Sequence, residues 1–370
     1  MKSFSEELES LNAFFDSKSD DAAADVMSSA DREEKSLQDI KILLSEKSTS
    51  HLPAMALKAK ELTARHFGNN INLYIPLYVS NECSNSCRYC GFNVNSPVER
   101  KTLTTEEARR EMENIAKTGM KNILILTGEH PQKAGVSYIE EIVKIAAGLF
   151  TQISLEVFAM DTPDYEKLVK AGATGLYIYQ ETYNRDVYAK LHQKGPKSDF
   201  DYRLLAPARA AEAGFRSVGI GALLGLDDPA RDMFMLFGHA KYLIKKFWRT
   251  DIGLSFPRIT QARGTDVNLY PVSEKMLAQY IIAARLCLER AGIALSTRES
   301  AEFRDNMTGL GVTKMSAGSK TSPGGYEICS EEPSGEQFSV HDTRNVEEVA
   351  SAIRARGYYA VFKDWEKTFK

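Results

Sequence analysis

The chain has 370 residues, of which 43% are hydrophobic and 26% charged, enough apolar content for one large barrel or two modest domains. Its net charge is −3, and Lys and Arg are dispersed, which argues against a nucleic acid partner. No apolar run reaches the roughly 18 residues that span a bilayer, and the N-terminus is too acidic for a signal peptide, so we expect a cytoplasmic protein with no membrane partner.

Residues 1–70 are predicted to form a helical leader. An acidic segment rich in Ala and Ser comes first, and amphipathic stretches follow at 37–45 and 51–68. The second stretch ends at a Gly, which is a helix stop signal. We expect the leader to lie against the main domain.

From residue 71, short apolar runs alternate with helical patterns, which is typical of parallel βα units. Several of the helical segments begin with Ser, Thr or Asp and end with Gly. Eight repeats over about 250 residues favour a TIM-type (β/α)8 barrel, although an open barrel of about six units has almost the same pattern. The predicted strands are 71–80, 122–128, 152–160, 175–181, 217–225, 252–258, 293–299 and 314–319.

The barrel is predicted to occupy residues 71–320, and residues 321–370 to form a C-terminal cap. The cap segment is rich in turn residues and then predicts a final helix from about Asn345 to Arg356. We expect it to cover one mouth of the barrel.

Polar residues follow six of the eight predicted strands at their C-terminal ends. Reactive residues of β/α barrels gather at that end, because all the parallel strands finish on the same face. We therefore predict a functional site there. The polar segments are NEC, GEH, QET, PR, TRES and SAGSK.

Three cysteines, Cys83, Cys87 and Cys90, lie on the loop after the first predicted strand with the spacing C-x3-C-x2-C. Iron–sulfur cubanes usually have four thiolate ligands, so three leave one iron with an open coordination position. A zinc knuckle is the alternative, but it requires a fourth Cys or His at a defined later spacing. The spacing favours a [4Fe–4S] cluster.

This motif, with an aromatic residue before its last Cys, resembles that of the radical S-adenosylmethionine superfamily. The resemblance implies that the amino and carboxylate groups of S-adenosylmethionine chelate the fourth iron. One electron then breaks the S–C5′ bond and gives a 5′-deoxyadenosyl radical. The expected cofactors are therefore a [4Fe–4S] cluster and S-adenosylmethionine.

Residues 60–365 further resemble the tyrosine lyase family of thiamine biosynthesis, the 2-iminoacetate synthases. The resemblance implies a carbon–carbon lyase that splits L-tyrosine at its Cα–Cβ bond into p-cresol and 2-iminoacetate for thiazole formation. It also implies thiazole synthase as a partner and an electron donor such as flavodoxin or ferredoxin. Segments that carry the resemblance are YCGF, LTGEHPQKAG, YIYQETYN, GIGALLGL, LSTRES, SKTSPGGY, EQFSVHD and KDW.

Three other functions stay open at this point. The hydrogenase-maturation tyrosine lyase is similar but continues into a domain with further cysteines, whereas only Cys329 lies in this tail. A radical lyase of another aromatic amino acid, such as tryptophan, also resembles the barrel. Outside the enzymes, the alternative is an iron–sulfur or zinc scaffold protein.

Four polar residues near strand ends are the candidates for binding S-adenosylmethionine. By resemblance, Glu129 holds the methionine amino group, as a carboxylate is suited to an ammonium. Gln180 and Glu181 are expected to accept hydrogen bonds from ribose hydroxyls. Arg203 is expected to pair with the cofactor carboxylate through its bidentate fork. For each, an ordinary role at the barrel rim or surface is the alternative.

Tyrosine is a zwitterion, so its site requires a cation for the carboxylate, and we predict Arg298 for this role. The alternative is a buried ion pair with Glu299 or Glu129. The resemblance implies that Tyr78 and Ser316 hold the polar end of the amino acid. The phenol end requires a polar partner, for which the candidates are Arg258, His239 and Ser255.

Overall fold

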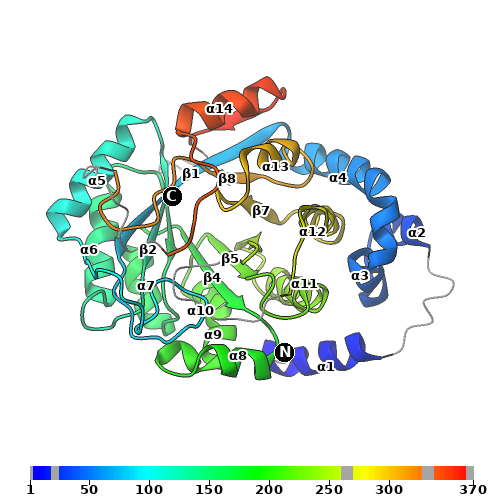
Figure 1. The fold of residues 1–370 in the computed structure, drawn as a ribbon, viewed down its shortest axis with the longest axis horizontal. Coiled ribbons are helices and arrows are strands. Elements are labelled where there is room, and N and C mark those ends of the chain that lie inside the picture. Colours follow the sequence, from blue (N-terminus) through cyan, green and yellow to red (C-terminus); the bar gives the residue numbers. More distant parts are fainter. Residues whose placement is uncertain (1–2, 18–24, 260–269, 327–336, 364–370) are drawn as a thin grey trace.

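A computed structural model describes residues 3–17, 25–259, 270–326 and 337–363. Eight parallel strands close into a barrel, because the order runs from β2 to β8 and returns through β1, which pairs with both β8 and β2 (Figure 1). The prediction of a (β/α)8 barrel is confirmed, and the open barrel of about six units is excluded. The barrel strands are β1 (Asn70–Ser80), β2 (Asn122–Thr127), β3 (Gln152–Glu156), β4 (Gly175–Glu181), β5 (Ser217–Ala222), β6 (Asp251–Ser255), β7 (Gly292–Leu295) and β8 (Lys314–Ser316).

Most of the predicted strands run past the observed C-terminal ends. The third was expected over 152–160 and stops at Glu156, and the seventh was expected over 293–299 and stops at Leu295. After β3 the apolar pattern continues because Val157 and Met160 are also buried, in a loop above the barrel, whereas the residues after β7 are polar and line the mouth. A ninth strand, β9 (Tyr359–Val361), pairs with the beginning of β1 outside the barrel and was not predicted.

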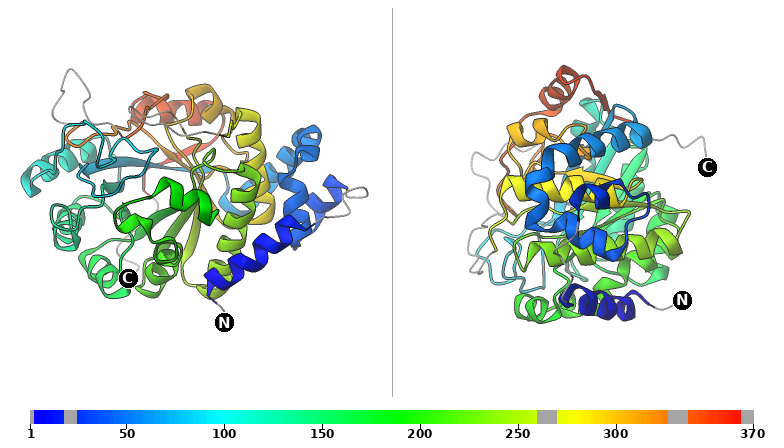
Figure 2. Two further views of the ribbon diagram at one scale, coloured as in Figure 1. Left: turned by 60° about the horizontal axis from the view of Figure 1, so that its bottom comes forward. Right: turned by 90° about the vertical axis from the view of Figure 1, so that its right-hand side faces the viewer.

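Helices cover the outer face of the barrel (Figures 1 and 2). The first of them, α5, begins with a capping box in which Thr104 and Glu107 each bind the backbone of the other. In the described part of the chain, no helix is both long and apolar enough to cross a membrane. The helices after the barrel strands are α5 (Thr105–Lys117), α6 (Val136–Ala146), α7 (Thr162–Ala171), α8 (Arg185–Leu191), α9 (Phe200–Leu204), α10 (Ala206–Glu212), α11 (Pro229–Lys246), α12 (Glu274–Cys287) and α13 (Ala301–Asn306), with a short 3-10 turn, η3 (Pro196–Ser198), before α9.

The leader lies along one side of the barrel, against α11 and α12 (Figure 2). The two predicted amphipathic stretches are confirmed as α3 and α4, whereas α1 was not predicted. Phe4, the first residue of α1, is fully buried and stacks on the ring of His239 in α11 at a centroid distance of 4.0 Å. The leader elements are α1 (Phe4–Asp16), α2 (Val26–Asp31), α3 (Leu37–Leu44), η2 (Glu46–His51) and α4 (Leu52–Phe67).

The tail returns to the barrel through a buried ion pair. Asp342 binds Arg304 of α13, and both side chains are fully buried. The predicted final helix is observed as α14 (Val346–Ala355), which Asn345 caps. Upstream, Gln337 and Phe338 lie at the C-terminal mouth of the barrel, where the cap was expected. Residues 327–336, which include Cys329, and residues 364–370 lie outside the described residues.

We predict that Phe4→Ala lowers the free energy of unfolding by about 3 kcal/mol, since it removes a fully buried ring and leaves a cavity on His239. Urea denaturation followed by circular dichroism measures the change. The matched control is Leu57→Ala, whose side chain is 67% exposed and whose loss should cost less than about 0.5 kcal/mol. Equal effects of the two substitutions would show that α1 contributes nothing through this contact.

Candidate active site

The cysteine loop lies at the C-terminal mouth of the barrel, directly after β1. Cys87 is buried, and Cys83 and Cys90 are partly accessible. The three thiols are close enough for each of the other two to act on the pKa of Cys87. Burial is the main cause that raises the pKa of the Cys87 thiol to about 12, because a buried thiolate loses its contact with water.

Backbone hydrogen bonds from three other segments hold the loop. The N–H of Ser84 donates to the carbonyl of Glu129 after β2, and the N–H of Ser86 donates to Lys194. Gly91 donates to the carbonyl of Gln337 in the tail. Gly195 has a φ of 93°, and a Cβ there would overlap Asn85, so only glycine allows this approach.

The environment of the thiols fits an iron–sulfur cluster. Donors already point at the sulfurs: the Asn85 amide lies 3.7 Å from Cys83 Sγ, the Phe92 N–H 3.4 Å from Cys90 Sγ, and the Gln337 amide 3.9 Å from Cys90 Sγ. Hydrogen bonds to sulfur are a means by which proteins tune cluster potentials. Tyr78 and Phe92 cover the loop with an edge contact at 5.8 Å.

A zinc site was the alternative for this loop. Within the described residues, no fourth Cys, His, Asp or Glu joins the three cysteines in a group that could hold one metal ion. A zinc site places its ligands about 2.0–2.3 Å from a single ion, whereas a cubane distributes its thiolates over separate irons.

A buried group of charges lies beside Cys87. Glu181, at the end of β4, binds Lys197 at 2.6 Å and lies 3.6 Å from Arg203. Burial acts to raise the pKa of Glu181, but Lys197 and Arg203 outweigh it, so the pKa lies below the ordinary value. The three side chains therefore carry one negative and two positive charges, which complements an amino acid zwitterion with its own carboxylate and ammonium.

The backbone at Glu181 is strained in order to present this carboxylate. In the described part of the chain, Glu181 is the one residue other than glycine with a positive φ, 73°. A bulge between Tyr179 and Glu181 shifts the register with β5, so both side chains line the cavity. Strain of this kind persists at functional sites when the surrounding contacts enforce it.

The structure brings three of the four predicted cofactor residues together beside the cysteine loop and places the fourth apart. Glu181 and Arg203 form the ion pair just described. Glu129 accepts a 2.6 Å hydrogen bond from Asn85 of the cysteine loop, and its charge acts on Arg203. Gln180 donates to the carbonyl of Phe200 behind the strand, and it does not line the cavity that holds Glu181. The sequence reasoning missed Lys197, which comes from a loop segment with no strand-end signal.

Arg298 extends into the same cavity and forms no salt bridge among the described residues, although the carboxyl groups of Glu156 and Glu181 are near enough to act on its charge. Its guanidinium lies over the Phe338 ring, 3.4 Å from the centroid. Neither predicted ion pair forms, because Glu299 binds Arg258 and Glu129 binds Asn85. Burial lowers the pKa of Arg298 from its ordinary value, yet an arginine stays charged in proteins. A buried guanidinium that lines a cavity and forms no salt bridge is suited to binding a carboxylate.

Glu156, which sequence reasoning also missed, ends β3 on the facing wall. Burial raises its pKa to about 7, and Arg298 opposes this rise. Tyr179 and Ser255 line the cavity around Arg298 together with Glu156, and Tyr179 lies near enough to the Glu156 carboxyl to lower its pKa. The available signal was a single acidic residue at the C-terminal end of an apolar strand.

The remaining substrate candidates lie around Arg298. Tyr78 donates a 2.7 Å hydrogen bond to Gln337, and Ser316 accepts one at 3.0 Å from the N–H of Thr297. Both line the cavity with Arg298. Of the three phenol candidates, Ser255 lines it, His239 is buried under Phe4, and Arg258 is occupied by Glu299.

A three-cysteine loop at the C-terminal mouth of a β/α barrel, beside buried charges of both signs, defines a radical S-adenosylmethionine enzyme. Residues 77–237 match the Radical SAM superfamily, and residues 255–359 match the Biotin and Thiamin Synthesis associated domain. The chain belongs to the 2-iminoacetate synthase family. It is 40% identical over 345 residues to 2-iminoacetate synthase of Salmonella typhimurium, and the aligned part covers 93% of this chain and 91% of that protein. To 2-iminoacetate synthase of Escherichia coli it is 39% identical over 345 residues, with the same two coverages.

Solved structures show the same fold. HydG, a maturase of the [FeFe]-hydrogenase, has a TM-score of 0.85 at 32% identity, covering 96% of this chain and 78% of that chain. HydG from Carboxydothermus hydrogenoformans has a TM-score of 0.88 at 31% identity, with 98% and 86% covered. Methylornithine synthase shares the fold at a TM-score of 0.74.

We predict that Cys83→Ala, Cys87→Ala and Cys90→Ala each prevent anaerobic assembly of about four irons per chain, because a cubane with two protein thiolates loses an anchoring iron. Iron and sulfide analysis after reconstitution measures the loss. The control is Cys287→Ala, a cysteine of α12 away from the loop, which should keep the wild-type iron content. Full iron content in any of the three loop variants would contradict the assignment.

Proposed function

We propose that this chain cleaves the Cα–Cβ bond of L-tyrosine, giving p-cresol and the 2-iminoacetate that thiazole formation in thiamine biosynthesis consumes. One observation carries the proposal: the guanidinium of Arg298, which forms no salt bridge among the described residues, lines one cavity with Cys90, Glu181 and Lys197, and Arg203 lies next to Glu181. Such a cavity can hold a substrate carboxylate next to a cluster-bound cofactor. The family relationship supports the same function.

The residues around the cavity divide the binding tasks. Cys83, Cys87 and Cys90 would hold the cluster, and Lys197, Arg203 and Glu181 the charged groups of the methionine moiety. When bound, the cluster and S-adenosylmethionine supply a carbon radical that removes one hydrogen from the substrate amine. Arg298 and Phe338 hold the substrate carboxylate and fix the distance of that hydrogen from the radical, since small displacements cost large factors in rate. Glu129 and Gln180 remain candidates for further contacts with the cofactor.

The two products together contain all the atoms of tyrosine, so the cleavage requires no water. Tyrosine divides into p-cresol and 2-iminoacetate, and an electron and a proton at the benzylic carbon replace the hydrogen taken from the amine. The electrons require an external reductant, for which we propose flavodoxin or ferredoxin, and we propose thiazole synthase as the acceptor of the imine. Tyr78, Phe92 and Phe338 exclude water from the reacting atoms, as radical chemistry demands.

The alternative functions are supported less well. The chain covers 78% of the HydG chain at 32% identity, against 91% of the Salmonella enzyme at 40%. A lyase for another aromatic amino acid would need a different partner at the phenol end, where Ser255 and Tyr179 here present hydroxyl groups. A non-catalytic scaffold does not explain why a buried arginine lines the cavity beside Cys90.

The decisive test is anoxic incubation of the reconstituted protein with S-adenosylmethionine, L-tyrosine and a reductant, followed by analysis for p-cresol. We predict p-cresol formation, and about a 100-fold loss of kcat/KM for tyrosine in Arg298→Met, because the substrate carboxylate loses its charged partner. Arg249→Met, at an exposed arginine beside Trp248, is the control and should keep full activity. Absence of p-cresol from the wild type, with 5′-deoxyadenosine still formed, would overturn the proposal.

We further predict that ionisation of Glu156 makes the kcat/KM of this reaction depend on pH. Its carboxylate faces Arg298, Glu181, Lys197 and Tyr179, and its pKa of about 7 means that it ionises between roughly pH 6 and 8. The ionised form can take the proton of the substrate ammonium and leave an amine.

The pH profile of kcat/KM tests this role. In the wild type, kcat/KM should rise as pH increases through about 7 and then level off. Glu156→Gln should lower kcat/KM and remove that limb. A variant that keeps the same limb would show that another group titrates.

A further inference from the structure

The two residues that directly follow Glu181 are held by a buried carboxyl group of α11. Thr182 and Tyr183 come after the end of β4, and both are buried. Asp232, in the first turn of α11, is buried as well. Its Oδ1 accepts a 2.8 Å hydrogen bond from the N–H of Tyr183 and a 3.0 Å hydrogen bond from the hydroxyl of Thr182. One oxygen of α11 therefore fixes the backbone just beyond Glu181.

A second residue on the same face of α11 binds the same segment. His239 follows Asp232 by seven residues, which is about two helical turns, so the two side chains lie on one face of the helix. The hydroxyl of Tyr183 lies 3.0 Å from His239 Nδ1. Burial lowers the pKa of His239 to about 3, so its ring is neutral. Helix α11 thus holds Tyr183 by both its backbone and its side chain.

The contacts of Asp232 complete a set that surrounds the strained residue Glu181. Before it, Arg203 Nε donates a 2.7 Å hydrogen bond to the carbonyl of Tyr179. At Glu181 itself, the carbonyl accepts a 2.8 Å hydrogen bond from the N–H of Leu223, directly after β5. A left-handed backbone is unfavourable for a residue other than glycine and persists only where neighbouring contacts enforce it. Asp232 supplies these contacts on the C-terminal side.

What Asp232 supplies is an acceptor oxygen more than a negative charge. Among the described residues, its second oxygen, Oδ2, has no hydrogen-bond partner. Burial raises the pKa of Asp232 to about 8, although its two hydrogen bonds oppose this rise, so the carboxyl group is largely neutral at pH 7. An asparagine has the same shape and an equivalent acceptor oxygen, whereas an alanine has no acceptor at all.

We propose that Asp232 is a positioning residue that keeps the Glu181 carboxylate in the cavity beside Cys90. This rests on the proposed function in one respect, the role of Glu181 in binding the methionine moiety of S-adenosylmethionine. Without Asp232, the segment after Glu181 is free to move, and the φ of Glu181 returns to negative values. The bulge between Tyr179 and Glu181 is then lost, and the carboxylate turns away from the cofactor.

Binding of S-adenosylmethionine to the anaerobically reconstituted holoenzyme tests this role. Equilibrium dialysis without a reductant measures the Kd, because the cofactor is then not cleaved. We expect Asp232→Ala to raise the Kd roughly tenfold while about four irons per chain are retained, and Asp232→Asn to stay within about threefold of the wild type. An unchanged Kd in the alanine variant, or equal weakening in both variants, would refute the proposal.

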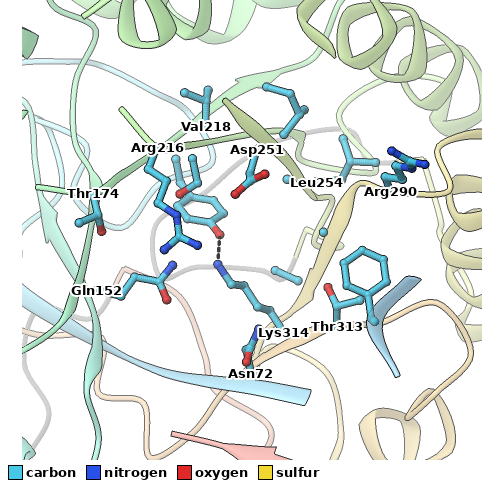
Figure 3. Close-up of a pocket in the computed structure, with 17 residues that line it drawn as sticks. Asn72, Gln152, Thr174, Arg216, Val218, Asp251, Leu254, Arg290, Thr313 and Lys314 are labelled. Carbon is cyan, nitrogen blue, oxygen red and sulfur yellow. Dashed lines mark hydrogen bonds between the residues drawn. The ribbon is translucent and has the colours of Figure 1, made fainter. Parts of the chain in front are cut away.

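The matched control is Gln152, the first residue of β3. It is buried, and its Oε1, like Asp232 Oδ2, has no hydrogen-bond partner among the described residues. It lines a cavity of about 260 Å³ at the N-terminal ends of the barrel strands, away from the cysteine loop (Figure 3). Gln152→Ala also removes a buried polar side chain, yet it should leave the Kd unchanged. A comparable rise in Gln152→Ala would show that general destabilisation of the barrel, and not the position of Glu181, weakens binding.

A double variant tests whether Asp232 acts through Glu181. Glu181→Gln alone should raise the Kd, because the cofactor ammonium loses a carboxylate partner. Adding Asp232→Ala to Glu181→Gln should raise the Kd by less than about twofold more, since the side chain that Asp232 positions no longer carries the charge. A further rise of about tenfold would show that Asp232 acts on the cofactor by another route and would refute the proposal.

A measurement on the apoprotein decides the matter if Asp232→Ala also loses iron. The N–H of Tyr183 donates to Asp232, so hydrogen exchange of the peptide that contains it reports the contact directly. Mass spectrometry should find faster exchange of this peptide in Asp232→Ala and wild-type exchange in Asp232→Asn. Unchanged exchange in the alanine variant overturns the proposal. Faster exchange with an unchanged Kd does so too, because the segment then moves without consequence for the cofactor.

The p-cresol assay on the wild type separates this proposal from the proposed function. The expected pattern of Kd values without p-cresol overturns the tyrosine reaction and leaves the role of Asp232 standing. Formation of p-cresol together with an unchanged Kd in Asp232→Ala overturns the role of Asp232 alone.

Discussion

The barrel interior is left partly unfilled, and the rest of the structure depends on this. β/α barrels normally pack their centre with layers of branched side chains. Here one wall has glycines on adjacent strands, where a Cβ at Gly219 or Gly221 would overlap Tyr177 or Tyr179. The rings of Tyr177 and Tyr179 occupy part of the space, and small cavities remain beside them. The fold thus gives up core packing at its centre, and stability has to come from the apolar layer between the strands and the outer helices.

Charge is distributed along that interior in a definite order. The thiols and the Glu181–Lys197–Arg203 group lie at the C-terminal mouth, Arg298 and Glu156 lie below them, and Lys314 lies at the far end. Each charged group either has a counter-ion at hand or faces a cavity, because an isolated charge in the core would be too costly. The order of the charges gives the barrel an axis along which polar molecules can be held.

Much of the fold followed from local patterns, and about half of the site did. The eight strands were predictable because the length and alternation of apolar runs and helical patterns can be read from contiguous residues. The cysteine loop was predictable because the spacing of its three cysteines can be read in the same way. Arg298 was predicted from its position after an apolar strand, and Tyr78 and Ser316 from the family resemblance; all three line one cavity. Lys197 and Phe338 reach the cavity from loop and tail segments, so no local pattern marks them. The bulge at Glu181 likewise decides which side chain faces inward, and strand alternation does not reveal it.

The docking of α1 on α11 has a consequence for biosynthesis. Phe4 is translated more than two hundred residues before His239, which belongs to the surface that buries it. Until α11 is made, the apolar face of α1, with Leu8 and Leu11, lacks this surface and is exposed to solvent or to a chaperone. The helix α1 therefore reaches its final place only after α11 is made, so an arrested nascent chain that lacks α11 would expose the apolar face of α1.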